Sequence, residues 1–150
     1  MKLLYTVRYA HLEGPSPLDL KATVKRGNVV GVMGDSGQST GPHLHIDCVQ
    51  DKQDSLYRLN DIYANDPMAD FKQLAHFIDE ELGAGPFRIT THIYDYRYKS
   101  KGKWKPHPGY DVVVETTHKR LYWNRSMDGA VILKGHDSGY GHYVCVAFRA

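Results

Sequence analysis

The segment 43–49 constrains the fold most, because it places two histidines at alternate positions of an apolar run, directly after Gly41–Pro42. Successive side chains of an extended strand point to opposite faces, so His43 and His45 are predicted to share one face. The apolar residues of the run are predicted to point into a core: Leu44, Ile46 and Cys48. Two imidazoles on one face suit a metal ligand beside a proton-transfer group. Such pairs also occur by chance on exposed strands, so their meaning depends on partners elsewhere in the chain.

Most of the remaining chain consists of short apolar runs separated by turns that contain glycine or proline, which is typical of a β-rich protein. In the first run, alternation predicts one face made of Tyr5, Val7, Tyr9 and His11. Residues 18–24 are expected to be extended, and residues 97–105 are expected to form a basic loop. Strands are predicted at 3–12, 29–33, 43–49, 87–96, 119–123, 130–133 and 143–148, and residues 106–114 are predicted to be a turn that runs into a buried strand.

One segment, residues 51–86, has helical character. Pro67 suits the first turn of a helix, and Gly83 suits its C-terminal stop. Between them an apolar stripe recurs at helical spacing, formed by Phe71, Leu74, Ala75, Ile78 and Leu82. We therefore expect a single domain over residues 1–150, β-rich (all-β or α+β), with one helical insert at 51–86.

The composition restricts the possible binding partners of the protein more than it restricts the reaction that it could catalyse. The net charge of +2 over 150 residues does not favour a nucleic-acid partner. No apolar run reaches the length of a membrane span, and the first residues lack the apolar segment of a signal peptide. Two cysteines, Cys48 and Cys145, form neither a zinc motif nor a disulfide framework; we expect buried thiols, with a single bridge left open. A monomer is expected.

A second candidate cluster contains His107 and Asp111, four residues apart at a predicted strand entry. A histidine and a carboxylate, joined by a histidine from another segment, make a three-ligand zinc site with one position open for water. This spacing of a histidine and an aspartate often occurs by chance, so it indicates a metal site only together with the other segments.

Three segments together resemble the signatures of peptidase family M23, the lysostaphin- and LytM-like zinc endopeptidases that cut peptidoglycan. They are Tyr9-Ala10-His11-Leu12, the run from Gly34 to His45, and His107-Pro108-Gly109-Tyr110-Asp111. The likeness extends to the intervening strands and covers about two-thirds of the chain, leaving out mainly residues 51–86. Tyr110 stands where the family usually has a small or aliphatic residue.

The order of these segments departs from the family, in which the His-x-x-x-Asp motif comes first rather than last. A circular permutation is the simplest account. It predicts that the strands formed by residues 143–150 and 1–11 are neighbours that a hairpin normally joins, and that the insert 51–86 joins the original termini. A second account is that this chain is one portion of a longer protein.

The resemblance implies an M23-like (lysostaphin-type) fold with an antiparallel sheet, circularly permuted. It implies Zn²⁺ bound by His107, Asp111 and His45. It also implies that His43 is the general base on the zinc-bound water, and that His11 polarises or protonates the tetrahedral intermediate. The expected reaction is hydrolysis of a peptide bond in the stem or cross-bridge of bacterial peptidoglycan. With no signal peptide expected, a phage lysin or a virion-associated module acting at the cell wall is favoured by analogy.

Two other hypotheses about the function are alternatives to a zinc peptidase. The loop Gly34-Asp35-Ser36-Gly37 superficially resembles the nucleophile loop of trypsin-like serine proteases, although the chain is short for a double barrel. The other reading is a catalytically inactive wall-binding or structural module. The basic segment around Trp104 could then hold anionic wall polymer or stack on sugar.

Overall fold

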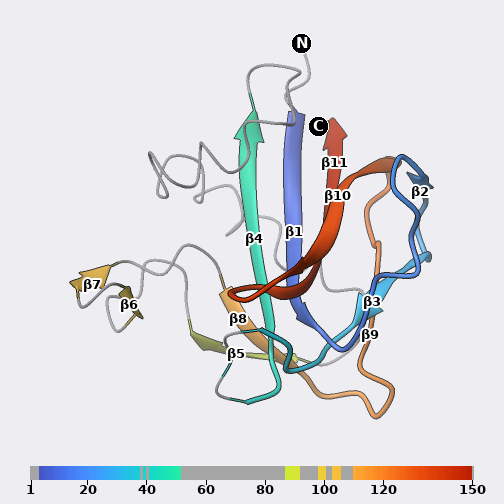
Figure 1. Cartoon of the computed structure of the whole chain (residues 1–150). Helices are drawn as coiled ribbons and strands as arrows, with labels where there is room; N and C mark the ends of the chain where they lie inside the picture. Colours follow the sequence, from blue (N-terminus) through green and yellow to red (C-terminus); the bar gives the residue numbers. More distant parts are fainter. Residues whose placement is uncertain are drawn as a thin grey trace.

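A curled antiparallel sheet dominates the computed structural model of this protein (Figure 1). The structure describes residues 4–37, 39, 41–51, 87–91, 98–100, 103–105 and 110–149. Within these residues every regular element is a strand, and none is a helix. The expected β-rich, antiparallel class is therefore confirmed. The helical insert predicted at 51–86 lies, apart from Asp51, outside the described residues.

Seven strands form the main sheet, in the order β2-β10-β11-β1-β4-β8-β5. Every pairing in it is antiparallel. Two smaller sheets pair β3 with β9 and β6 with β7. The strands are β1 (Leu4–Leu12), β2 (Thr23–Val24), β3 (Val29–Val32), β4 (Leu44–Asp51), β5 (Phe87–Thr91), β6 (Tyr98–Ser100), β7 (Lys103–Lys105), β8 (Tyr110–Val114), β9 (Arg120–Tyr122), β10 (Gly129–Asp137) and β11 (Gly141–Arg149).

Two local predictions are wrong. In the segment expected to be extended, residues 18–24, only Thr23–Val24 is a strand, because the chain turns at 20–21. The basic segment 97–105 is not simply a loop, because it contains the antiparallel pair β6 and β7. Alternating lysines and an aromatic residue are compatible with a short two-stranded ribbon, which the reading of the segment as a loop overlooked.

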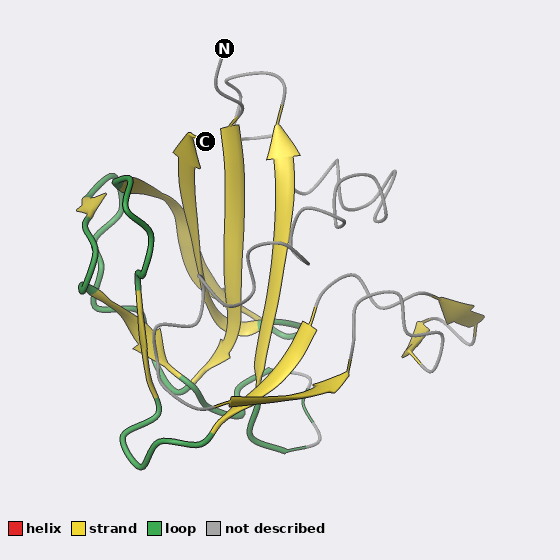
Figure 2. Cartoon of the chain, turned by 180° about the vertical axis from the view of Figure 1, so that it is seen from behind, coloured by secondary structure: helices red, strands yellow, loops and turns green. Residues whose placement is uncertain are grey.

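The hydrophobic core lies between one face of the main sheet and the small β3–β9 sheet (Figure 2). Leu44 and Ile46 of β4 are fully buried in it, as the alternation predicts. From the small sheet side, Val30, Leu121 and Trp123 join the same cluster. The ring of Trp123 packs edge-on against Phe148 of β11, with 5.5 Å between ring centroids. The opposite face of the sheet is therefore left to carry polar side chains.

The alternation predicted for the first strand fails at His11. Tyr5, Val7 and Tyr9 share one face as expected, and the structure places that face in the core, but Leu12, and not His11, continues it. The pairing of β1 with β11 shifts between Tyr9 and Leu12, and His11 has a left-handed backbone with φ of 60°. An extra residue at a β-bulge reverses the alternation beyond it. His11 is thereby directed away from the core.

The strands nearest the two chain ends are neighbours, as the sequence predicts. β1 pairs with β11 from Leu4 opposite Arg149 to Tyr9 opposite Val144. Cys48 lies on β4 and Cys145 on β11, so the whole of β1 separates them. Two strand spacings amount to about 9.5 Å, beyond the roughly 7 Å between Cα atoms that a disulfide spans. The structure therefore excludes the bridge between these two cysteines.

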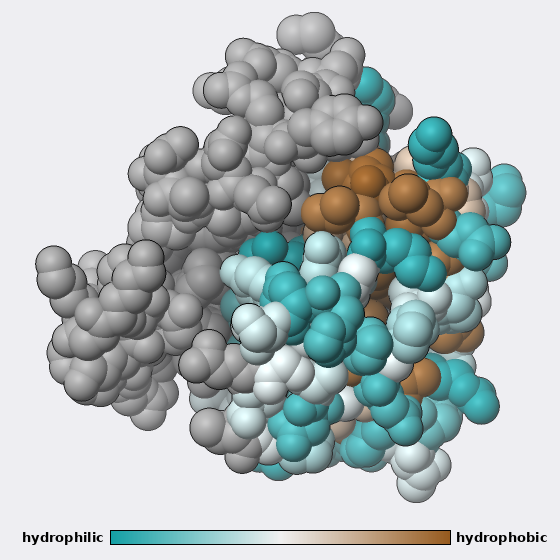
Figure 3. Space-filling view, in the orientation of Figure 1, coloured by the Kyte–Doolittle hydropathy of each residue, from teal (hydrophilic) through white to brown (hydrophobic). Residues whose placement is uncertain are grey.

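Hydrophilic residues dominate the described surface in Figure 3, and the largest hydrophobic group lies above them, beside β10. Among the described residues, Leu20 is the exposed large hydrophobic side chain, with 52% of its surface accessible. The described part contains no helix long and apolar enough to cross a membrane.

Candidate functional site

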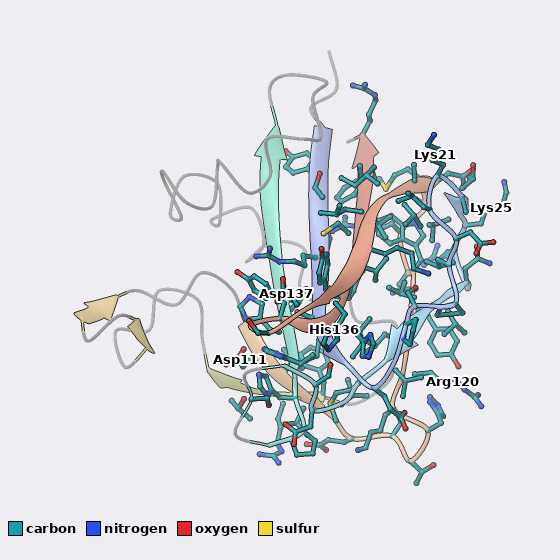
Figure 4. The ribbon with its side chains drawn as sticks, in the orientation of Figure 1. Lys21, Lys25, Asp111, Arg120, His136 and Asp137 are labelled. Carbon is teal, nitrogen blue, oxygen red and sulfur yellow. The ribbon has the colours of Figure 1, made fainter. Side chains whose placement is uncertain are left out.

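Three neighbouring strands bring the predicted site residues together through their pairing register. His45 on β4 lies opposite Ala10 of β1 on one side and opposite Asp111 of β8 on the other. Residues paired across strands share a face, so the Asp111 carboxylate meets the His45 ring. The distance between His45 Nδ1 and Asp111 Oδ1 is 3.1 Å. Figure 4 shows Asp111 on β8, the strand that pairs with β4.

His43 enters the same group from the start of β4. Its Nε2 lies 3.7 Å from Asp111 Oδ1. Its Nδ1 lies 2.8 Å from the carbonyl oxygen of Gly41 and 3.1 Å from Ser39 Oγ. Since a carbonyl oxygen can only accept, Nδ1 carries a hydrogen and donates it to Gly41. This bond leaves Nε2, on the Asp111 side, as the nitrogen that could act as a general base.

The bulge places the His11 ring beside the other two histidines. Its centroid lies 4.7 Å from that of His43 and 6.2 Å from that of His45. The strained backbone is held on both sides, because His11 N–H donates to Tyr140 O and Gly34 N–H donates to His11 O. A left-handed non-glycine residue whose main chain is fixed in this way is typical of functional sites.

The protonation of His11 is set by burial and by one hydrogen bond. Its Nδ1–H donates to the carbonyl of Ser36 at 2.7 Å, which leaves Nε2 as the atom facing the cluster. Burial lowers the pKa of His11 below its ordinary value of 6.5, and the nearby His43 and His45 act in the same direction. The Ser36 bond and Asp111 oppose this lowering of the pKa without overcoming it. The ring is therefore neutral near pH 7 in the metal-free protein.

The residues present fit a zinc ion in kind. Nitrogen and carboxylate oxygen are common zinc ligands, and ligand atoms on a tetrahedral zinc lie about 3.3 Å apart, given bonds of about 2.0–2.1 Å. The 3.1 Å between His45 and Asp111 is close to that value. The third predicted ligand, His107, lies outside the described residues. Among the described residues no three such side chains are arranged to hold a metal ion.

Arg8 and Tyr140 support the site, and the sequence did not identify either of them as a supporting residue. Arg8 is buried, its NH2 donates to Tyr140 Oη at 2.9 Å, and its Cζ lies 3.8 Å from the centre of that ring. The Tyr140 ring in turn lies 5.9 Å from the ring of His45. The signal was present, because Arg8 is two residues from Ala10 and so shares the face that His45 occupies.

Ser36 ties the loop before β4 to two strands, and its contacts argue against a serine nucleophile. Its Oγ donates to Leu12 O at 2.5 Å and accepts from His142 N–H at 3.0 Å. The His11 ring bonds the Ser36 carbonyl and not the hydroxyl, so it does not act as a base on that oxygen. Loss of activity in Ser36→Ala would therefore report lost structure rather than a lost nucleophile.

Comparison with known proteins gives one match. Residues 2–56 match the model of peptidase family M23, a little more than a third of the chain. The match contains β1 and β4 and therefore His11, His43 and His45, but not Asp111. No curated protein and no solved structure matches the chain. The similarity thus supports a peptidase on the β1–β4 part of the site.

The first prediction concerns the proton on His11. In metal-free protein, NMR titration of the ring should give a midpoint below 6.5, because burial disfavours the charged form. The unfolded chain then binds more protons in this range, so the stability that the neutral His11 contributes is present above pH 6.5 and is lost as pH falls below it. A His11 midpoint above 6.5 would contradict the proposed environment.

The second prediction concerns the contact between the loop before β4 and the start of β11. A Cβ on Gly141, where φ is +63°, would lie 2.3 Å from Ser36 atoms, and Gly141→Ala should destabilise the fold by roughly 2–5 kcal/mol. Gly27 is the matched control: φ is +92° and nothing lies within 4 Å of a Cβ, so Gly27→Ala should cost only about 1–2 kcal/mol. Urea unfolding followed by tryptophan fluorescence measures both, and equal losses would show that the contact is not tight.

Proposed function

We propose that this protein is a zinc-dependent endopeptidase that hydrolyses peptide bonds in the stem or cross-bridge of bacterial peptidoglycan. One observation carries the proposal: His11, His43, His45 and Asp111 converge from three strands on a single polar cluster. The similarity of residues 2–56 to peptidase family M23 supports the peptidase chemistry. The substrate and the metal rest on the resemblance of the three motifs to that family.

In this proposal Asp111 and His45, with His107, hold the metal. The carboxylate and imidazole are already within ligand spacing of each other, at 3.1 Å. When bound, Zn²⁺ polarises a carbonyl and lowers the pKa of a water molecule toward 7. The His45 ring is held from its other side by Tyr140, whose hydroxyl is fixed by Arg8. The His45 side chain therefore needs little rearrangement to bind the metal.

His43 and His11 divide the proton transfer between them. His43 takes the proton of the attacking water at Nε2, because its Nδ1–H is committed to Gly41. His11 Nε2 can donate a hydrogen bond only after it has gained a proton, which burial disfavours in the free protein. Negative charge that develops on the substrate carbonyl raises the pKa of a nearby imidazole, so His11 takes up a proton from solvent and becomes a donor as the oxyanion forms. This gives a physical basis for the sequence expectation that His11 polarises or protonates the tetrahedral intermediate. When the C–N bond breaks, His43 passes the proton that it took from water to the leaving amine.

The circular permutation is proposed on the same basis. Its main structural requirement is the antiparallel pairing of β1 with β11, and the two strands run side by side from Leu4–Arg149 onward (Figure 1). The permuted order of the motifs then needs no change in the site. We further propose action at the bacterial cell wall as a monomer, as part of a lysin or virion-associated protein, and without a nucleic-acid partner.

The third prediction tests the metal and the reaction together. Asp111→Asn should lose most of its bound zinc, measured by elemental analysis, and its release of soluble fragments from purified walls should fall at least about 100-fold. Asp128→Asn is the matched control, because it removes an exposed carboxylate paired with Lys25 at 3.2 Å and should change neither quantity.

Mass spectrometry of the released fragments identifies the bond that is cut. Removal of zinc by a chelator should abolish fragment release, and added Zn²⁺ should restore it. If wild-type protein with a full complement of zinc binds walls and releases nothing, the enzyme proposal fails and the wall-binding alternative is supported.

The fourth prediction isolates the general base. His43→Gln should lower kcat by about 10²–10⁴-fold while zinc content stays at the wild-type level, because His43 is assigned to proton transfer and not to the metal. His118→Gln, which removes an exposed histidine whose ring packs against Tyr122, should retain wild-type kcat. A His43→Gln variant that loses its zinc would instead make His43 a ligand.

A further inference from the structure

A second pair of histidines lies on the hairpin of β10 and β11 and has no role in the proposed reaction. His136 and His142 are direct partners across the two strands, and their ring centroids lie 4.6 Å apart. His136 is exposed and His142 is half-buried, so both rings are open to solvent on a rigid antiparallel scaffold. Figure 4 shows His136 together with Asp137, where β10 ends and the turn into β11 begins.

This pair is separate from the peptidase site. His142 pairs with Leu12, whose side chain is in the core, whereas His45 pairs with Ala10. The bulge at His11 lies between Ala10 and Leu12 and reverses the alternation, so these two residues are on opposite faces of β1. Cross-strand partners share a face, so the two histidine groups belong to opposite faces of the sheet. An ion at one pair therefore does not use the ligands of the other.

The spacing of the two rings matches that of two imidazoles on one metal ion. With metal–nitrogen bonds of about 2.0–2.1 Å, ring centroids lie about 4.5 Å apart at a 90° angle and about 5.2 Å apart at a tetrahedral angle. The observed 4.6 Å is near the right-angle value. Right angles between ligands are typical of tetragonal Cu²⁺ and Ni²⁺, which also bind imidazole more tightly than most divalent ions.

We propose that His136 and His142 form a second, surface metal site that chelates a Cu²⁺- or Ni²⁺-type ion, with water completing its coordination. Among the described residues no third histidine, cysteine or carboxylate completes a protein-only site, which agrees with a two-ligand chelate. Asp137 Oδ1 is already used by the turn, where it accepts from the N–H groups of Gly139 and Tyr140. The site goes beyond the proposed peptidase function and does not depend on it.

A metal ion bound by His136 and His142 would also stabilise the position of His11 in the peptidase site. His142 N–H donates to Ser36 Oγ, and the carbonyl of Ser36 holds the His11 ring. The turn that follows His136 carries Tyr140, whose carbonyl accepts the N–H of His11. Because a ligand that binds only the folded state stabilises it, occupancy should raise the melting temperature of the whole protein.

The fifth prediction uses the iminodiacetate complex of Cu²⁺, added to the chain of 150 residues. The chelator fills three positions of the ion and leaves room for two neighbouring imidazoles, so the probe selects a two-histidine site over a three-ligand one. Calorimetry should detect one site whose affinity falls at least about tenfold in His136→Asn. His118→Asn is the matched control and should bind as the wild type does.

Further readouts separate this proposal from the peptidase one. Asp111→Asn should keep the affinity for the copper complex, even though zinc and activity are expected to be lost there. The order of affinity should be Cu²⁺ above Ni²⁺ above Zn²⁺. The copper complex should raise Tm by a few degrees in wild type and not in His136→Asn. Unchanged affinity in His136→Asn, a loss in Asp111→Asn, or tightest binding of Zn²⁺ would each overturn the second site.

Discussion

The register of β4 between β1 and β8 is the constraint on which the site depends. It sets His45 opposite Asp111 while Leu44 and Ile46 fill the core on the other face. A slip of one residue would exchange the two sets, burying the histidine in the core and exposing the apolar side chains. The same burial that stabilises the sheet therefore holds the two predicted ligands 3.1 Å apart, so that no separate device is needed to align them.

The backbone of His11 is the second constraint, and it shows where strand alternation stops being a guide. Period-two reasoning correctly placed Tyr5, Val7 and Tyr9 on one face, and His43 with His45 on one face. It failed at His11, because a bulge depends on how β1 pairs with β11 and on a main-chain bond to Tyr140, both of which involve residues more than 100 positions away. A single strand contains no local signal for such a shift, whereas the family motif located His11 by its chemistry.

The residues that support the site, Arg8 and Ser36, were hard to predict for a related reason. An arginine in a strand is usually a solvated residue, and only the folded sheet shows Arg8 buried with its guanidinium against the ring of Tyr140. Ser36 was noticed for its hydroxyl, yet its main effect is to connect β1, β11 and the His11 ring. The residues proposed to perform chemistry are suggested by type and spacing, but those that position them are defined by contacts between distant segments.

The position of the site along the strands explains why the order of the motifs need not affect the chemistry. His11 lies at the end of β1, and Gly141 at the start of β11, so the site occupies one end of this strand pair. The Leu4–Arg149 end is seven residues away, or about 23 Å along the strand. A connection made or broken at that far end changes no contact among His11, His45 and Asp111. What must be preserved is the set of strand neighbours, and the sheet can present the same polar cluster whichever strand comes first in the chain.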